Sequence, residues 1–270
     1  MKEHRIQTRL GQISVAVDER GTDIPLVFMH GVFLDKSLWA DCSSSITGRT
    51  HIYIDMPAHG VSSNVGHDWS LNDCVEMFMH ILNELGITRC IVIGHSWGSM
   101  TALRAASRYP SHFAALGLFN MPFKRSVGMG RLAFTLQKLM TGFPRFYAKQ
   151  AAKSLYTKQM LSARPEFSVS MQERLAKRPS REISRVIDAV ILNAEDATHL
   201  LNILKVPALA IIGESDYVGV PPSMKTVTVP GGHISPHEAP AETRLAIEQV
   251  LKLAALVPNN QMQPTGYAGG

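Results

Sequence analysis

The feature that most constrains the fold is an apolar Ile-Val-Ile run, residues 91–93, that passes directly into Gly94-His95-Ser96-Trp97-Gly98. A Gly-x-Ser-x-Gly pentapeptide between a buried strand and a helix is typical of a sharp turn that lifts the serine clear of the sheet. Gly94 and Gly98 supply the small flanking positions that such a turn needs. A helix that begins after Ser96 would also direct unpaired backbone N–H groups toward a developing negative oxygen. An ordinary strand-to-helix turn whose serine has no catalytic role fits the pentapeptide equally well. The other motifs of the sequence must therefore distinguish the two interpretations.

Other predicted strands also end in polar or glycine-rich segments. Residues 25–29 lead into His30-Gly31, residues 51–54 into Asp55, residues 208–212 into Gly213-Glu214-Ser215-Asp216, and residues 226–229 into Pro230-Gly231-Gly232-His233. Open α/β sheets place their sites at the carboxyl ends of the strands. We therefore expect these segments to meet near Ser96.

The chain order of Ser96, Asp216 and His233 resembles that of the α/β-hydrolase superfamily, from about residue 8 to about residue 255. The motifs that carry this resemblance are His30-Gly31, a D-x-P-x-x-G-x-S pattern over residues 55–62, the Gly-x-Ser-x-Gly turn, Gly213-x-x-Asp216 and Gly232-His233. The sequence is most similar to the small esterases, lactonases and carbon–carbon bond hydrolases of that superfamily. Dehalogenases are disfavoured because they carry aspartate at the position of Ser96. The resemblance implies an α/β fold with a doubly wound, mostly parallel sheet and an inserted helical cap.

The resemblance also implies a catalytic triad. Ser96 would be the nucleophile, His233 the general base, and Asp216 the residue that orients the imidazole. The backbone N–H groups of Val32 and Trp97 would form the oxyanion hole, with Phe33 as the alternative donor to Val32. No cofactor and no metal are implied, and the expected partner is a small ester-like molecule.

The assignment of the acid leaves alternatives open. Only residues 213–224, which include Pro221-Pro222, connect the strand before Asp216 to the next strand. A parallel crossover needs about a dozen residues or more, so this link has room for one helical turn. Glu214, on the same turn, and Asn120, after the preceding strand, are the alternative orienting residues.

Several other residues near these motifs receive supporting roles in this interpretation. We expect His30 and His95 to support turns, and His237 to support the start of the last helix. Asp55 and His59 are expected to organise the loop after their strand. The Trp97 indole is expected to pack on the pocket wall or under the cap.

The pattern along the chain predicts one core interrupted by a cap. Residues 1–120 and 201–257 form the predicted core, residues 121–200 the cap, and residues 258–270 a disordered tail. Core helices are predicted near residues 71–85, 97–109 and 241–256. The cap shows only helical periodicity, and its two apolar stripes are interpreted as packing surfaces: Leu132, Leu136 and Leu139, then Ile183, Val186, Ile187, Val190 and Ile191.

Charge is unevenly distributed over the 270 residues, whose formal net charge is +5. No Asp or Glu occurs among the basic residues Lys124, Arg125, Arg131, Lys138, Arg145, Lys149, Lys153, Lys158 and Arg164. We expect a solvated helix face there, with an anionic substrate or an acidic membrane surface as alternatives. Nothing resembles a nucleic-acid recognition module, and membrane contact is not the favoured interpretation.

The sequence predicts a soluble protein. It shows no secretory signal and no run of apolar residues long enough to span a bilayer. Three cysteines, Cys42, Cys74 and Cys90, fit a reducing cytoplasm. The oligomeric state stays open.

The favoured function is hydrolysis of a carboxylic ester or lactone through an acyl-enzyme. The alternatives are carbon–carbon bond hydrolysis of a ring-cleavage product, a cofactor-free perhydrolase or haloperoxidase activity, and a low-turnover ligand-binding protein. A pure binding protein has no physical need for Ser96, Asp216 and His233 together, so the complete set favours an enzyme.

Overall fold

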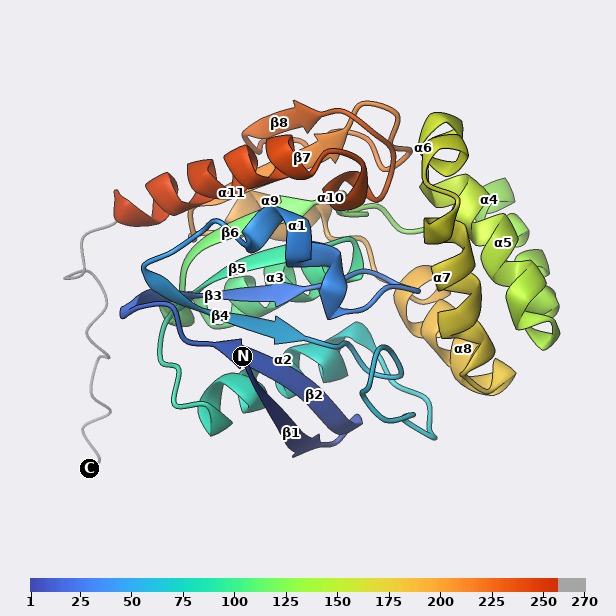
Figure 1. Ribbon diagram of the computed structural model, residues 1–270, viewed down its shortest axis with the longest axis horizontal. Helices are drawn as coiled ribbons and strands as arrows, with labels where there is room; N and C mark the ends of the chain where they lie inside the picture. The colour runs from blue at the N-terminus through green and yellow to red at the C-terminus, as the bar shows by residue number, and fades with distance from the viewer. Residues whose placement is uncertain (257–270) are drawn as a thin grey trace.

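The computed structural model describes residues 1–256, which are built around one eight-stranded sheet (Figure 1). The strand order is β1-β2-β4-β3-β5-β6-β7-β8. The β1–β2 and β2–β4 pairs are antiparallel, and all the other pairs are parallel, so the expected mostly parallel sheet is confirmed. The strands are β1 Lys2–Thr8, β2 Gly11–Asp18, β3 Asp23–Met29, β4 Arg49–Ile54, β5 Cys90–His95, β6 Phe113–Phe119, β7 Ala208–Gly213 and β8 Thr226–Val229.

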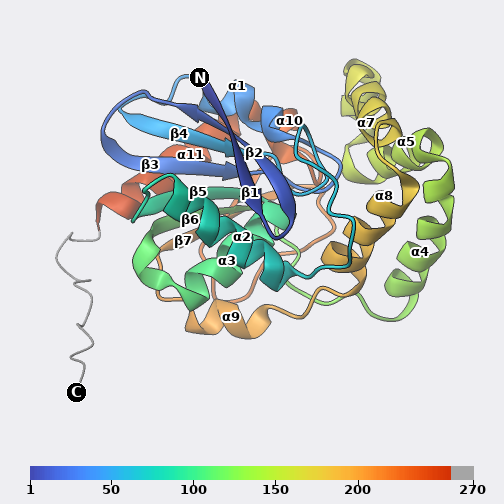
Figure 2. The ribbon, with the colours of Figure 1, turned by 90° about the horizontal axis from the view of Figure 1, so that it is seen from below.

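Helices cover both faces of the sheet, which explains why every residue of β5 and β6 is buried. Helices α2 (Leu71–Glu84) and α3 (Trp97–Arg108) pack together on one face, while α1 (Ala40–Ser43) and α11 (Pro240–Ala255) lie on the other (Figures 1 and 2). Helix α2 begins at Ser70 in a capping box with Asp73, as its sequence predicts. The short α9 (Thr198–Ile203) packs against α3.

Two features of the sheet depart from the sequence expectations. Strand β1 was not predicted, because only Ile6 of its seven residues is buried and no apolar alternation marks it. It is an edge strand held by antiparallel pairing with β2. The link between β7 and β8 has room for one turn of helix, but it contains only reverse turns and irregular backbone.

The expected helical insert lies between β6 and α9, beyond the carboxyl ends of the parallel strands (Figure 1). It contains α4 (Gly128–Lys138), α5 (Pro144–Leu155), α6 (Lys158–Ala163), α7 (Glu166–Ala176) and α8 (Ser180–Ile187), and α8 continues into a π-helical turn, Asp188–Leu192. We keep residues 121–200 as the proposed bounds of this cap. The expected disordered tail, residues 258–270, lies outside the described residues. None of the helices in residues 1–256 combines the length and apolarity needed to cross a bilayer.

One of the two predicted packing surfaces in the insert is wrong. Ile183, Val186, Ile187 and Val190 are buried as expected, and Ile191 is partly buried. Leu132 and Leu136 on α4, and Leu139 directly after it, instead face outward and are 49%, 56% and 77% exposed. The inner face of α4 carries Arg131, which donates to the Leu192 carbonyl, and Lys138, which pairs with Asp188. Helical periodicity identifies an apolar face but not what covers it.

Candidate active site

Ser96 lies on a strained turn between β5 and α3. Its backbone has φ of 49° and ψ of −110°, a conformation that non-glycine residues rarely adopt. A Cβ atom at Gly94 would come within 2.5 Å of the Ser99 nitrogen, and one at Gly98 within 2.3 Å of the Met29 carbonyl oxygen. Both glycines are therefore required by close backbone approach, and the turn places the serine hydroxyl above the end of the strand.

The structure brings Ser96, His233 and Asp216 together from three different segments. The Nε2 atom of His233 lies 2.9 Å from the Ser96 Oγ, and its Nδ1 lies 2.9 Å from Oδ1 of Asp216. The side chains of His233 and Asp216 are almost completely buried. The Asp216 carboxylate can only accept a hydrogen bond, so Nδ1 of His233 carries a proton, and the tautomer that this contact selects presents Nε2 as an acceptor to the serine hydroxyl.

The second carboxylate oxygen of Asp216 accepts a 2.7 Å hydrogen bond from the Asn120 side-chain amide. The Ser235 hydroxyl donates to the Asn120 Oδ1 at 2.5 Å and fixes which end of that amide faces the carboxylate. Burial raises the pKa of Asp216, but hydrogen bonds from His233, Asn120 and the Val218 backbone N–H outweigh it and hold the pKa below its ordinary value.

Neither of the two alternative orienting residues, Asn120 and Glu214, is hydrogen-bonded to the His233 imidazole. Asn120 contacts Asp216 rather than His233, and it also donates to the Gly232 carbonyl at 3.2 Å. Glu214 is exposed on the turn before Asp216. Asp216 is the acidic residue whose carboxylate meets the imidazole.

The backbone N–H groups of Val32 and Trp97 stay proposed as oxyanion donors. In the part of the chain that the structure describes, neither is paired with a protein acceptor. The N–H of Phe33, the alternative donor, is engaged in a 2.9 Å hydrogen bond to the Nε2 of His59. Val32, Phe33 and Ser96 all line the same cavity, so it is the engagement of the Phe33 N–H by His59 that favours Val32 as the donor.

The neighbouring histidines act as fixed supports for the site loops. His30 Nε2 accepts from the Met56 N–H at 2.9 Å, so it joins the loops after β3 and β4. His95 Nε2 lies 2.7 Å from the His233 carbonyl oxygen, to which it donates, and burial lowers the pKa of His95 to about 3. His237 was expected to support the last helix, but it contacts the insert: its Nδ1 lies 2.7 Å from the Tyr156 hydroxyl, and its ring stacks on Phe167.

The Trp97 indole is completely buried and takes no part in the cavity wall beside Ser96. It stacks on Trp69 with 5.4 Å between the ring centroids and meets the edge of His59 at the same centroid distance. The indole thus holds the segment before α2 against α3, while the backbone of Trp97 faces the site.

A cavity of about 290 Å³ opens beside Ser96 and His233, under the insert. Its lining is mainly apolar, and α4, α5 and the π-helical turn contribute Phe134, Tyr147, Leu155, Val190 and Ile191. Beside the triad residues, the polar side chains on the wall include Lys124, Ser126, Gln137 and Ser154. The arrangement can hold a mainly apolar small molecule with its reacting carbonyl at the serine.

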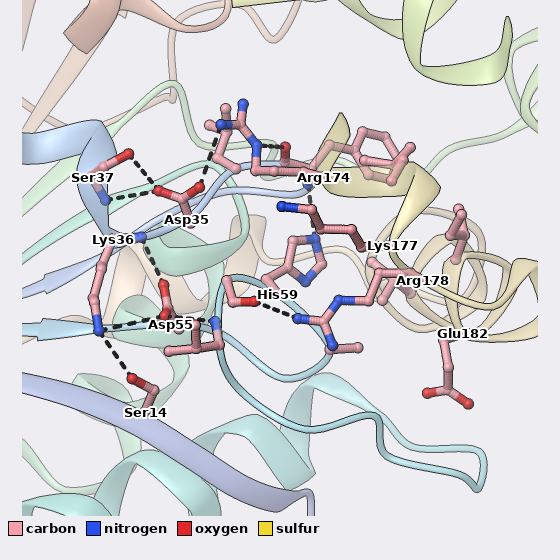
Figure 3. Close-up of a pocket in the computed structure, with 18 of the residues that line it drawn as sticks. Ser14, Asp35, Lys36, Ser37, Asp55, His59, Arg174, Lys177, Arg178 and Glu182 are labelled. Atoms are coloured by element: carbon pink, nitrogen blue, oxygen red, sulfur yellow. Dashed lines mark hydrogen bonds and ion pairs between the residues drawn. The ribbon is translucent and has the colours of Figure 1, made fainter. Parts of the chain in front are cut away.

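A second, charged cavity of about 550 Å³ lies between α7 and the loops after β3 and β4 (Figure 3). Arg174 donates to the Phe33 carbonyl at 3.1 Å and pairs with Asp35 at 3.3 Å. Arg178, just beyond the end of α7, donates to the carbonyls of Gly60 and Ser62. Arg174 thus joins the insert to the loop that carries Val32, and Arg178 joins it to the loop after β4. Neither arginine was predicted from the sequence, where their spacing of four residues is the only signal.

Residues 1–256 contain no group of three or more His, Cys, Asp or Glu side chains placed to hold a metal ion. All three cysteines are free and buried. Burial raises the pKa of the Cys42 thiol to about 12.

Comparison with known proteins agrees with this geometry. Residues 24–239 match the family described as the alpha/beta hydrolase fold. A 100-residue stretch is 35% identical to the sn-1-specific diacylglycerol lipase of Danio rerio and covers 35% of this chain but only 30% of that protein. The chain thus spans less than half the length of such curated relatives.

Solved structures match over nearly the whole chain. A thermophilic esterase from Thermogutta terrifontis superposes with a TM-score of 0.79 at 21% identity, covering 94% of this chain and 99% of that one. The enol-lactonase from Burkholderia xenovorans superposes with a TM-score of 0.80 at 17% identity, covering 89% and 96%. At these identities the likeness shows the fold, which agrees with the expected architecture.

Proposed function

Because the chain belongs to the alpha/beta hydrolase fold family, we propose that it cleaves a carboxylic ester or lactone through an acyl-enzyme on Ser96. The observation that carries this proposal is the His233 imidazole, which bridges Ser96 Oγ and Asp216 Oδ1 with 2.9 Å on each side. Chymotrypsin-type chemistry needs a base held in one tautomer by a buried carboxylate, and this arrangement provides it.

In the proposed first half-reaction, Ser96 Oγ attacks the carbonyl carbon while His233 Nε2 takes the hydroxyl proton. The negative oxygen of the tetrahedral intermediate accepts hydrogen bonds from the Val32 and Trp97 N–H groups. The bond to the leaving alkoxide then breaks, and His233 returns its proton to that oxygen. In the second half-reaction, water loses a proton to His233 and attacks the acyl carbon. The bond from that carbon to Ser96 Oγ then breaks, and His233 passes the proton to Oγ, which frees Ser96 and releases the carboxylic acid.

The cavity indicates the substrate class. Its modest size and mainly apolar wall favour an ester with a short to medium apolar acyl or alcohol group, or a lactone of similar size. Lys124 on the wall would also accommodate a substrate that carries a carboxylate.

The test is a screen of p-nitrophenyl esters of increasing acyl length together with several lactones, run in parallel on the parent protein and on Ser96→Ala. We expect ester or lactone turnover in the parent and its loss in the variant, because no other group replaces the nucleophile. A fluorophosphonate probe should label the parent at Ser96 alone. Mass spectrometry of the labelled peptides locates the adduct.

Two outcomes would contradict the proposal. One is turnover that survives in Ser96→Ala, and the other is a parent protein that is labelled nowhere and turns over none of these substrates. Peroxide with acetate, and a ring-cleavage product as substrate, belong in the same screen because they report the alternative activities of this fold family.

A further inference from the structure

The outer end of the insert exposes several large apolar side chains that lie close together in the sequence. Fifteen such side chains are strongly exposed in residues 1–256, and seven of them fall within residues 127–146. We refer to these seven as the apolar stripe, and each is at least 49% exposed: Val127, Met129, Leu132, Leu136, Leu139, Phe143 and Phe146. Helices α4 and α5 form the end of the molecule opposite the end of α11 (Figures 1 and 2). A concentration of this kind on a surface marks an interaction site.

The stripe is separate from the cavity beside Ser96. Met129, Leu132 and Leu136 recur at helical spacing on the outer face of α4, and Leu139 continues this spacing in the 3-10 turn that follows. The inner face of α4 contributes Phe134 and Gln137 to the cavity wall. The outer face is therefore the apolar side of α4, and it serves neither the core nor the cavity.

Basic side chains flank the stripe, and its own stretch of sequence, residues 124–165, contains no Asp or Glu. The acidic group recorded against α4 is Asp188, which pairs with Lys138 on the inner face. Lys124 and Arg125 are exposed at the start of the stripe, and Arg145, Lys149 and Lys153 are exposed along α5, on the same side of that helix as Phe146. Two copies of the chain joined through this face would bring like charges together, which disfavours a dimer as the occupant.

We propose that the apolar stripe docks on the surface of an anionic lipid bilayer, with its side chains between the head groups and the flanking Lys and Arg side chains on the lipid phosphates. Exposed Leu, Met and Phe beside a cationic flank are the combination by which a protein lies in a membrane interface. This proposal does not depend on the hydrolase activity. It would place the inner wall of the cavity close to the lipid, within reach of a substrate that partitions into the bilayer.

The test is co-sedimentation of the full chain, at low ionic strength, with vesicles of phosphatidylcholine alone and of an equimolar mixture with phosphatidylglycerol. We expect binding to the mixed vesicles and little binding to phosphatidylcholine. The triple variant Leu132→Ser, Leu136→Ser, Leu139→Ser should lower the partition coefficient more than about tenfold, because it removes the side chains that enter the interface. Lys149→Glu with Lys153→Glu should lower it more than about 20-fold, because each lost cation alone is worth about fivefold.

Matched controls come from α11, which also carries an exposed leucine and an exposed lysine. Leu245→Ser and Lys252→Glu should bind vesicles like the parent. Ser96→Ala should also bind normally, so a failure of the hydrolase proposal is distinguished from a failure of docking. All stripe variants change exposed positions, and retention of the parent melting temperature checks that they fold.

Three results would overturn the proposal. The parent protein fails to bind the mixed vesicles, or it binds both vesicle types equally, or the folded triple variant binds as tightly as the parent. Sedimentation velocity tests whether a second copy of the chain, rather than a lipid bilayer, covers the stripe. A parent dimer that the triple variant abolishes, without vesicle binding, assigns the stripe to a second copy of the chain.

Discussion

The Asn120 side-chain amide donates a 2.7 Å hydrogen bond to Oδ2 of Asp216, the oxygen that His233 leaves unused. Both oxygens of a buried carboxylate thus accept hydrogen bonds, and the interactions with His233, Asn120 and the Val218 N–H hold the pKa of Asp216 below its ordinary value. This arrangement keeps the carboxylate ionised and fixed in place, as an orienting residue for His233 requires.

Replacement of the orienting carboxylate tests its role directly. Asp216→Asn should lower kcat by about 10² to 10⁴, because an amide can donate to Nδ1 and so favours the wrong imidazole tautomer. The measurement is steady-state turnover of the best ester from the screen. Glu214→Gln on the same exposed turn is the control and should keep kcat within about threefold. The reverse ranking would transfer the role to Glu214.

The Asn120 contact predicts a pH-dependent loss of stability. Asn120→Asp removes the donor and places a second carboxylate beside Asp216, so the pKa of one of the pair rises. Above that raised pKa the two charges repel each other, and as pH falls through it the pair takes up a proton and the repulsion is relieved. The melting-temperature deficit relative to the parent should therefore be larger at pH 8 than at pH 5. Asn193→Asp, at an exposed position, provides the control. A deficit independent of pH would refute the electrostatic explanation.

The glycine after the serine turn should tolerate no side chain. Gly98→Ala would bring a Cβ within 2.3 Å of the Met29 carbonyl oxygen, so we expect a loss of at least about 2 kcal/mol, or failure to fold. Gly130→Ala is the matched control, since a Cβ there meets nothing within 4 Å and α4 should gain up to about 1 kcal/mol. Differential scanning calorimetry measures both. Equal melting temperatures for the two variants would contradict the close approach at Gly98.

A buried neutral histidine predicts how stability changes with pH. Burial lowers the pKa of His59 from 6.5 to about 3, while its Nε2 accepts a hydrogen bond from Phe33. Between pH 6.5 and about pH 3, His59 is protonated in the unfolded chain but not in the folded protein. The free energy of unfolding therefore falls as pH falls through this range. The contribution is about 1.4 kcal/mol per pH unit.

His59→Gln should reduce the pH dependence of the unfolding free energy by about that amount between pH 6 and pH 4, as measured by urea denaturation. The matched control is His199→Gln, because His199 is exposed on α9. An unchanged slope in His59→Gln, with a changed slope in His199→Gln, would show that His59 does not carry the effect.

The parts of the molecule that followed from the sequence are those with a local signal. The apolar runs and the glycines that follow them placed Ser96, Asp216 and His233 at strand ends, and the capping residue Ser70 marked the start of α2. These features depend on backbone geometry and burial within a few residues, which a single sequence records. The grouping of the three residues as a triad came from the family resemblance.

The features that were missed depend on long-range contacts. Strand β1 forms because β2 offers it a free edge, and its own residues carry almost no apolar pattern. Arg174 meets the Phe33 carbonyl 141 residues away, and no spacing rule records such a contact. The outer stripe of α4 has the periodicity of a packing face, so only the structure shows that it faces outward.

Arg174 of α7 and Arg178, which follows that helix, tie the insert to two loops of the core. Arg174 holds the loop after β3, and Arg178 holds the loop after β4. The Leu155 carbonyl at the end of α5 also accepts a 3.0 Å hydrogen bond from the His233 backbone N–H. A displacement of the whole insert must therefore break hydrogen bonds to the loop that carries Val32 and to His233 itself.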